Sequence, residues 1–382
     1  MDLEFSTEEA ELRDNVRSVL AASCPPSLVR SIFEGSGDAE SLWKQMVDLY
    51  WPGLAIPEPL GGLGMGYVEV AIVVEELGRV VAPGPFLPTV TQFAPAVRSL
   101  GEDRHHEHFL SAVASGELTG SLALAEEGAW EPAAVRTVAR HTGDAWRLSG
   151  SKSSVLSGAP AFDELVVVAR AEGTHGLDGL GAFVIPWASV ETTSRRVIDP
   201  TLPLVDVRLD DVEVPEERVL AAPGAEHVPA ALAVVLEEAT AAVALSTVGT
   251  CRSIFESTLD YAKVREQYGR PIGSFQALKH RFADLYLSLE RATSLCYFAA
   301  LTIAEDDPRR SEAVSLAKAA VGDCQRLMAQ DGLQLHGGIG FTWENDLHFL
   351  LKRAKCGDPL FGSAAWHRGR LAEQHGLLEV SA

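Results

Sequence analysis

The last third of the chain constrains the fold most, because it consists of long helix-forming segments joined by short breaks. The segments are rich in Ala, Leu and charged residues, and Gly or Pro punctuates them at 269–273, 308, 337–340 and 359. Long helices with short joins pack as antiparallel neighbours in a bundle. The pattern predicts helices over 229–264, 275–305, 309–335, 343–354 and 363–374.

The middle of the chain has a different character and predicts strands. Its apolar segments are short, rich in Val, Leu and Ala, and bounded by Gly, Asp and Pro, as is typical of an antiparallel β-domain. We expect strands over 121–125, 135–139, 146–148, 165–169, 182–185 and 205–214.

The first third predicts helices again. Ser6 and Glu9 have the spacing of a capping box ahead of apolar positions at helical intervals. Further helices are expected over 40–50 and 67–80, with a Pro- and Gly-rich loop over 51–66. The fold class is therefore α+β: an N-terminal helical domain (1–118), a central antiparallel β-domain (119–226) and a C-terminal helical bundle (227–382).

Charge and composition exclude several classes of protein. The 382 residues include 32 Lys and Arg against 53 Asp and Glu, a net charge of −21. This excess argues against nucleic acid or an anionic membrane as the main partner, although one well-placed Arg can still bind a phosphate. The N-terminus is polar and acidic, and Glu237 and Glu238 interrupt the most apolar stretch. We expect neither a signal peptide nor a membrane span.

Cysteine and histidine spacings give no sign of a disulfide frame or a metal site. The five cysteines are scattered without a CxxC pair, so we expect buried thiols and a cytoplasmic location. The run 105–108, His-His-Glu-His, is interpreted as a solvated turn rather than a metal site. Glycines 61, 62, 64 and 66 fail the GxGxxG spacing and predict tight turns.

Two segments of the last third carry the most information. The first reads Arg-Glu-Gln-Tyr-Gly-Arg-Pro-Ile-Gly-Ser-Phe-Gln over 265–276, and the second reads Gln-Leu-His-Gly-Gly-Ile-Gly-Phe-Thr-Trp-Glu over 334–344. Together, on a helix–strand–helix chain of this length, they resemble the acyl-CoA dehydrogenase family. Three shorter motifs match that family as well: Pro57, Glu58, Gly61 and Gly62; Glu75, Glu76, Gly78 and Arg79; and Gly150, Lys152, Ser157 and Gly158.

The resemblance implies a fold, a cofactor and a set of contacts. In this family a C-terminal four-helix bundle builds a tetramer, and FAD takes a hydride from an acyl-CoA while a glutamate removes the α-proton. An arginine fork matches phosphate oxygens, and glycines let the backbone approach a pyrophosphate. The residues that would hold the ADP half of FAD are Arg265, Gln267, Tyr268, Ile272, Phe275, Gln276, Gln334, Gly337 and Gly338.

The flavin half of the site departs from the family. Ala125-Glu126-Glu127 stands where the family usually has Thr-Glu-Pro, so the hydroxyl that would bond the flavin is absent. Ser154-Val155-Leu156 stands where the family has Trp-Ile-Thr or Trp-Ile-Ser, so the ring beside the flavin is also absent.

The usual base is missing too, so no catalytic residue is assigned. The family's Tyr-Glu-Gly falls on Leu360-Phe361-Gly362, which puts Phe361 at the base position. An alternative base position falls on Ala239, and the neighbouring Glu238 points about 100° away on a helix. A one-residue slip in register would bring Glu238 there, which makes it the one weak candidate.

These features together resemble the non-catalytic subunit of heterotetrameric (α₂β₂) acyl-CoA dehydrogenases of actinobacterial steroid catabolism. The implied partners are a homologous subunit that shares the FAD, an acyl-CoA substrate and an electron-transfer flavoprotein. One alternative is a self-sufficient homotetrameric dehydrogenase with a displaced base such as Glu238 or Asp358. Another is a non-redox acyl-CoA-binding protein or lyase, against which the intact Arg265 and Gln334 count.

Overall fold

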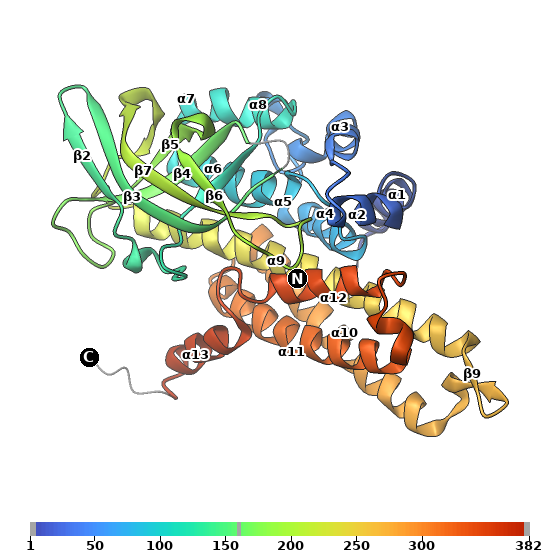
Figure 1. The fold of residues 1–382 in the computed structure, drawn as a ribbon. Helices are drawn as coiled ribbons and strands as arrows, with labels where there is room; N and C mark the ends of the chain where they lie inside the picture. Colours follow the sequence, from blue (N-terminus) through green and yellow to red (C-terminus); the bar gives the residue numbers. More distant parts are fainter. Residues whose placement is uncertain (1–4, 159–161, 378–382) are drawn as a thin grey trace. The chain divides into compact units, whose positions relative to one another are not determined.

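The computed structural model describes residues 5–158 and 162–377, with helices before and after a central set of strands (Figure 1). The helices are α1 (Thr7–Ser23), α2 (Pro26–Phe33), α3 (Glu40–Asp48), α4 (Tyr67–Arg79), α5 (Phe86–Pro88), α6 (Ala94–Leu100), α7 (Asp103–His105), α8 (Ser111–Ala114), α9 (Val228–Val264), α10 (Gln276–Ala304), α11 (Arg310–His336), α12 (Leu347–Gly357) and α13 (Ala364–Gln374). The strands are β1 (Gly120–Ala123), β2 (Val138–Thr142), β3 (Ala145–Leu156), β4 (Glu164–Ala171), β5 (Leu180–Pro186), β6 (Glu191–Ser194), β7 (Leu204–Pro215), β8 (Val219–Ala221), β9 (Glu266–Gln267) and β10 (Arg270–Pro271).

The chain folds as two compact units, each built from separate stretches of sequence. The helical unit comprises Met1–Gly37, Tyr67–Ala82 and Thr240–Ala382, and the mixed unit comprises Asp38–Gly66 and Pro83–Ala239. Segments of the first third therefore belong to both units. The three-domain division at 118 and 226 stays a prediction.

The mixed unit is organised by its sheet, whose strand order is β6-β7-β3-β2-β4-β5-β8, with β1 also paired to β4. The run Leu-Val-Val-Val-Ala over 165–169 lies in β4 and is buried on both faces. Leu165 and Val167 belong to one apolar cluster, whereas Val166 and Val168 belong to the other. Because neighbouring side chains of a strand point to opposite faces, a strand covered on both sides is a continuous apolar run.

The expectation of a purely antiparallel sheet is wrong in one respect. β1 and β2 both pair with β4 in parallel, while the remaining pairs of the sheet are antiparallel. Parallel pairing needs a crossover connection. Here the chain between β1 and β4 contains the β2–β3 hairpin, which provides that crossover.

Two glycines allow a close helix crossing in the helical unit. A Cβ on Gly78 of α4 would lie 2.0 Å from the Ser246 carbonyl oxygen, and a Cβ on Gly249 of α9 would lie 2.0 Å from the Glu75 carbonyl oxygen. Real Cβ atoms do not approach so closely, so only glycine permits this contact between α4 and α9. The Gly of the Glu-Glu-x-Gly-Arg motif thus has a packing role.

Most predicted helices are confirmed within a few residues, including the capping box of Ser6 and Glu9 at the start of α1. The helical run α5 to α8 was not predicted, because its prolines indicate breaks. Pro95 lies near the start of α6, directly after a π-helical turn (Thr89–Phe93), so the helical run continues through this proline. Four of the five cysteines are buried, Cys356 is half-buried, and all five are free thiols.

Helix α9 is the one helix, among the described residues, whose length and composition would allow it to cross a membrane. Of its most apolar stretch, 67% is buried inside the protein. Core helices of this kind are apolar all round because protein surrounds them.

Candidate functional site

The first predicted segment forms a small hairpin between α9 and α10 (Figure 1). Tyr268 and Gly269 have φ values of 55° and 76°, and they connect the antiparallel strands β9 and β10. Two central residues with positive φ are the signature of a type I′ turn, whose twist matches that of a hairpin. The Ile272 N–H donates to the Arg265 carbonyl at 2.7 Å and closes the base of the loop.

The side chains of this hairpin are presented to the outside. Tyr268 is 93% exposed. The ring of Phe275 contacts the Tyr268 ring at 6.2 Å between centroids, and the Arg270 guanidinium lies 4.2 Å from the Phe275 centroid. Gln267 is exposed, Ile272 lies in a 3₁₀ turn (Ile272–Ser274), and Gln276 begins α10.

The second predicted segment begins where α11 ends. Gly337 has a φ of 61° and donates its N–H to the carbonyl of Gln334, whose side chain is exposed. A Cβ added to Gly337 or Gly338 would meet nothing within 4 Å. The backbone of both glycines is therefore open to an approaching ligand.

A ring stack joins these two segments. Tyr261 lies four residues before Arg265, and its ring stacks on that of His336, with centroids 4.6 Å apart. The Nδ1 atom of His336 lies 2.8 Å from the Gly332 carbonyl, so Nδ1 carries the proton. The stack brings the ends of α9 and α11 together. Neither ring was assigned a role from the sequence: Tyr261 lies outside the first segment, and His336 lies within the second.

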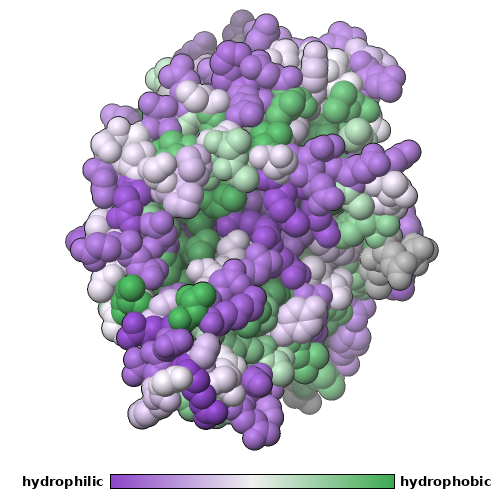
Figure 2. All heavy atoms as spheres, turned by 90° about the vertical axis from the view of Figure 1, so that its right-hand side faces the viewer, coloured by the Kyte–Doolittle hydropathy of each residue, from purple (hydrophilic) through white to green (hydrophobic). Residues whose placement is uncertain are grey.

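This end of the helical unit fits the ADP portion of FAD. Arg265 is exposed, and its guanidinium forms no ion pair within the described residues. Its fork is thus available to phosphate oxygens, and the glycine backbone beside it is accessible. Large apolar side chains are exposed in or directly beside these two segments, at Val264, Tyr268, Ile339, Phe341 and Trp343. Figure 2, which faces the right-hand side of Figure 1, shows hydrophobic patches among hydrophilic atoms on that face.

Glu126 stands where the family usually has the Glu of Thr-Glu-Pro, and its carboxylate is held by hydrogen bonds within the mixed unit. Its carboxylate accepts from Lys152 Nζ at 2.6 Å, from the Thr137 hydroxyl at 2.6 Å, and from two backbone N–H groups at 2.7 and 3.0 Å. Burial favours a higher pKa, yet Lys152 and Thr137 hold the pKa of Glu126 below its ordinary value. Burial also lowers the pKa of Lys152, to about 8.

The same network explains a family-like motif. A Cβ on Gly150 would lie 2.6 Å from the Thr137 hydroxyl oxygen, so the glycine makes room for Thr137 beside Glu126. Gly150 and Lys152 thus hold the connection between β1 and β2 in place.

The second flavin position is closed as well. Ser154 has a φ of 56°, its N–H donates to Asp206 at 3.1 Å, and its hydroxyl accepts from the Arg195 guanidinium. Val155 and Leu156 are buried in the β-domain.

Phe361, which stands where the resemblance places the base, is a buried apolar side chain with a φ of 56°. Its carbonyl lies 3.0 Å from Nε2 of His367, so that nitrogen donates and Nδ1 accepts from the Ser315 hydroxyl at 3.2 Å. Burial lowers the pKa of His367 to about 3, which keeps the ring neutral. The turn therefore offers no carboxylate, and Asp358 is three residues away in chain order.

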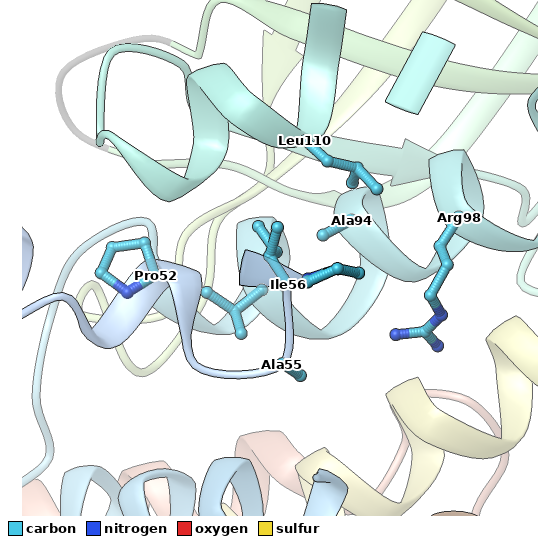
Figure 3. A pocket seen from close by; sticks show the side chains of 8 residues that line it. Pro52, Ala55, Ile56, Ala94, Arg98 and Leu110 are labelled. Carbon is cyan, nitrogen blue, oxygen red and sulfur yellow. The ribbon is translucent and has the colours of Figure 1, made fainter. Parts of the chain in front are cut away.

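Glu238, the weak candidate base, is buried and forms an ion pair with Arg98. Arg98 lines a small apolar cavity of about 20 Å³ in the mixed unit, enough for one water. Figure 3 shows Arg98 at one end of this cavity and Pro52 at the other, with Ile56, Ala94 and Leu110 between them. The carboxylate of Glu238 is therefore engaged in an ion pair within the mixed unit.

The His-rich run is not a solvated turn. His105 is buried at the end of α7, where Nδ1 accepts from the Glu102 N–H at 3.0 Å and Nε2 donates to the Glu217 carbonyl at 3.2 Å. Its ring ties the helix to the strand region, an effect that the local sequence does not reveal. Across residues 5–158 and 162–377, no three or more His, Cys, Asp or Glu side chains are grouped to hold a metal.

Comparison with known proteins agrees with this architecture. The models of the acyl-CoA dehydrogenase N-terminal and C-terminal domains match residues 6–117 and 230–376. Acyl-CoA dehydrogenase IpdE2 of Mycobacterium tuberculosis is 30% identical over 349 residues, covering 91% of each chain.

Solved structures show the same likeness over nearly the whole chain. In the ChsE4–ChsE5 complex of M. tuberculosis, the matched chain is 26% identical with a TM-score of 0.87, covering 100% of both chains. In the Tcur3481–Tcur3483 steroid ACAD, the values are 28% and 0.84, with 97% of this chain and 98% of that chain covered. The chain therefore belongs to the FAD-dependent acyl-CoA dehydrogenase family.

Proposed function

We propose that this chain is the subunit of a heterotetrameric acyl-CoA dehydrogenase that supplies the ADP half of an FAD site. A homologous partner chain supplies the flavin contacts and the base. The complex performs α,β-dehydrogenation of a bulky acyl-CoA, such as a steroid side chain or ring remnant. It works in the cytoplasm and passes electrons to an electron-transfer flavoprotein.

One asymmetry carries the proposal. The segments around Arg265 and Gly337 are open and exposed, whereas Glu126 accepts four hydrogen bonds within the chain and the Ser154 hydroxyl accepts from Arg195. Phe361 adds a buried apolar group at the base position. A general base contributes about 10²- to 10⁴-fold in rate, so a chain that lacks one is a poor dehydrogenase by itself.

The roles of this chain's residues follow from their chemistry. FAD supplies the hydride acceptor when it is bound. Arg265 would bind the pyrophosphate oxygens through its planar guanidinium, and the uncrowded backbone at Gly337 and Gly338 would let the pyrophosphate approach closely. The amides of Gln267 and Gln334 donate to the nucleotide, and Tyr268 with Phe275 offers an apolar platform.

The relatives support the heteromeric part of the proposal by analogy. The ChsE4–ChsE5 structure is a complex of two chains, and the Tcur3481–Tcur3483 structure is described as a steroid ACAD. Each of these two structures is named after two different components, and the proposed assembly also contains two different chains. The exposed apolar side chains beside Arg265 fit a surface that a partner covers.

Flavin stoichiometry tests the proposal. Expressed alone, the chain should hold little FAD. Coexpressed with a homologue that carries Thr-Glu-Pro, the central Trp and a glutamate base, it should form a tetramer with about half as many flavins as chains. Flavin-to-protein absorbance and molecular mass measure both. Full flavin occupancy of the isolated chain would instead indicate the self-sufficient enzyme, and no flavin in any assembly would indicate a non-redox acyl-CoA-binding protein or lyase.

A further inference from the structure

A polar hollow of about 430 Å³ lies in the helical unit, lined by side chains of α1, α4, α9 and α10. Four arginines converge on it: Arg13, Arg17, Arg79 and Arg252. None of the residues around Arg265 or Gly337 lines this hollow. It is therefore a feature separate from the FAD segments.

Two buried carboxylates hold the arginines in place. Glu75 accepts from the Tyr297 hydroxyl at 2.6 Å and lies 3.6 Å from both Arg13 and Arg252. Glu76, its neighbour on α4, pairs with Arg17 at 2.7 Å and Arg79 at 3.3 Å. The two carboxylates are only 4% and 2% exposed, so they cannot turn toward water.

Two further carboxylates pair with Arg79 and Arg252 on the solvent side of the hollow. Glu256 pairs with Arg79 at 2.7 Å, and Glu290 pairs with Arg252 at 3.1 Å. Their side chains are 49% and 41% exposed. Because water reaches these two carboxylates, they can be hydrated when they turn away, although Arg79 holds Glu256 through two hydrogen bonds, at 2.7 and 3.3 Å.

We propose that the hollow is a binding site for a phosphate dianion, either free or as the phosphoryl group of a small metabolite, which takes the places of Glu256 and Glu290. The four guanidinium groups balance the four carboxylates. When the two outer carboxylates turn away, Glu75 and Glu76 remain and the site carries two net positive charges. Arg79 and Arg252 then present forks to the ligand, a geometry that suits phosphate oxygens.

The remaining lining fits such a ligand. The Tyr286 hydroxyl lines the hollow and can donate to a phosphate oxygen or to an attached sugar. The Thr293 hydroxyl accepts from Arg252 at 3.1 Å and donates to the Leu289 carbonyl at 3.0 Å, so it helps to orient Arg252. The Ser294 hydroxyl donates to the Glu290 carbonyl at 2.8 Å. A volume of about 430 Å³ falls in the range of small-molecule sites, which is roughly 300–1,000 Å³. It exceeds what one phosphate needs and leaves room for an organic group.

Binding of inorganic phosphate and of ribose 5-phosphate to the full chain tests the proposal by calorimetry at low ionic strength. All variants in this experiment also carry Arg265→Ala, which removes the arginine proposed to bind FAD. Any phosphate binding that remains is then due to the hollow, so this proposal can fail while the proposed function stands, and the reverse. We expect saturable binding that weakens as salt is added, because salt screens the charges. Tighter binding of ribose 5-phosphate identifies a phosphorylated metabolite as the ligand, and equal binding identifies free phosphate.

Charge-neutral variants sharpen the test. Glu256→Gln with Glu290→Gln should tighten phosphate binding roughly tenfold, because two competing carboxylates are removed. Asp260→Asn is the matched control: it removes a charge from an exposed carboxylate of α9 that pairs with Lys263 outside the hollow. It should leave affinity unchanged. The proposal is overturned if neither ligand binds below about 10 mM in any variant, or if Asp260→Asn tightens binding equally.

Discussion

The rings of Tyr261 and His336 stack with their planes 17° from parallel, and this contact joins the last turns of α9 and α11. Tyr261 lies one helical turn before Arg265, and His336 directly precedes Gly337. The stack therefore sets the spacing between Arg265 and Gly337, although neither ring was among the residues expected to contact FAD.

Replacing Tyr261 should loosen the cofactor without unfolding the chain. Tyr261→Ala removes a ring pair worth about 0.5–1.5 kcal/mol, so we expect FAD affinity of the complex to fall roughly tenfold. Tyr261→Phe keeps the stack and serves as the control. Flavin fluorescence during dialysis measures the loss. Equal flavin retention in both variants would contradict a positioning role for the stack.

Arg265→Ala should strip flavin from the whole complex, although this chain holds no complete flavin site. A lysine cannot reproduce the bidentate fork, so Arg265→Lys should recover only part of the flavin. Ser154→Ala should leave flavin content and turnover unchanged, because that hydroxyl bonds to Arg195 within the chain. The flavin-to-protein absorbance ratio, with tetramer mass checked, compares the variants. The proposal that the FAD site is divided between two chains is wrong if the Arg265→Ala complex keeps its flavin or the Ser154→Ala complex loses it.

Glu238 should matter for stability and not for chemistry. Glu238→Gln keeps an acceptor for Arg98, so turnover of the complex should change less than twofold, with a cost of about 1 kcal/mol in unfolding free energy. Arg98→Met takes the guanidinium away from a buried carboxylate and should cost about 3 kcal/mol. Urea denaturation and steady-state kinetics measure these effects. A hundredfold loss of turnover in Glu238→Gln with flavin retained would identify Glu238 as the base.

Lys318 should make stability depend on alkaline pH. This fully buried side chain donates to the carbonyls of Gly357 and Asp358 at 2.7 and 2.8 Å, and burial lowers its pKa from 10.5 to about 7. Between about pH 7 and 10.5 the unfolded chain binds the proton that the folded chain has released. The contribution of Lys318 to stability therefore rises with pH in this window, by at most about 1.4 kcal/mol per pH unit.

Urea denaturation of the wild type and of Lys318→Met between pH 7 and 9 isolates this effect. The difference in unfolding free energy between them should shift with pH in favour of the wild type as pH rises. Lys44→Met, at an exposed position on α3, should show no such shift relative to the wild type. A pH-independent difference for Lys318→Met would show that Lys318 keeps its ordinary pKa in the folded chain.

Local patterns in the sequence were enough to predict much of the fold. The helices of the last third and the buried strand β4 are confirmed, because helical periodicity and continuous apolar runs depend on neighbouring residues only. Strand β6 was missed since all four of its residues are exposed and show no apolar alternation. The parallel pairing of β1 with β4 was missed because strand register between distant segments has no local signal.

The sequence by itself determined the order of helices and strands, because this follows from periodicity along the chain, and it indicated the family through motifs that resemble those of known members. The tertiary structure alone decided what individual polar groups do. Glu126 accepts from Lys152, and Glu238 pairs with Arg98 across 140 positions of sequence. Whether a carboxylate is a base or one half of a buried ion pair depends on its partner's position in space, and a single sequence carries no record of such long-range contacts.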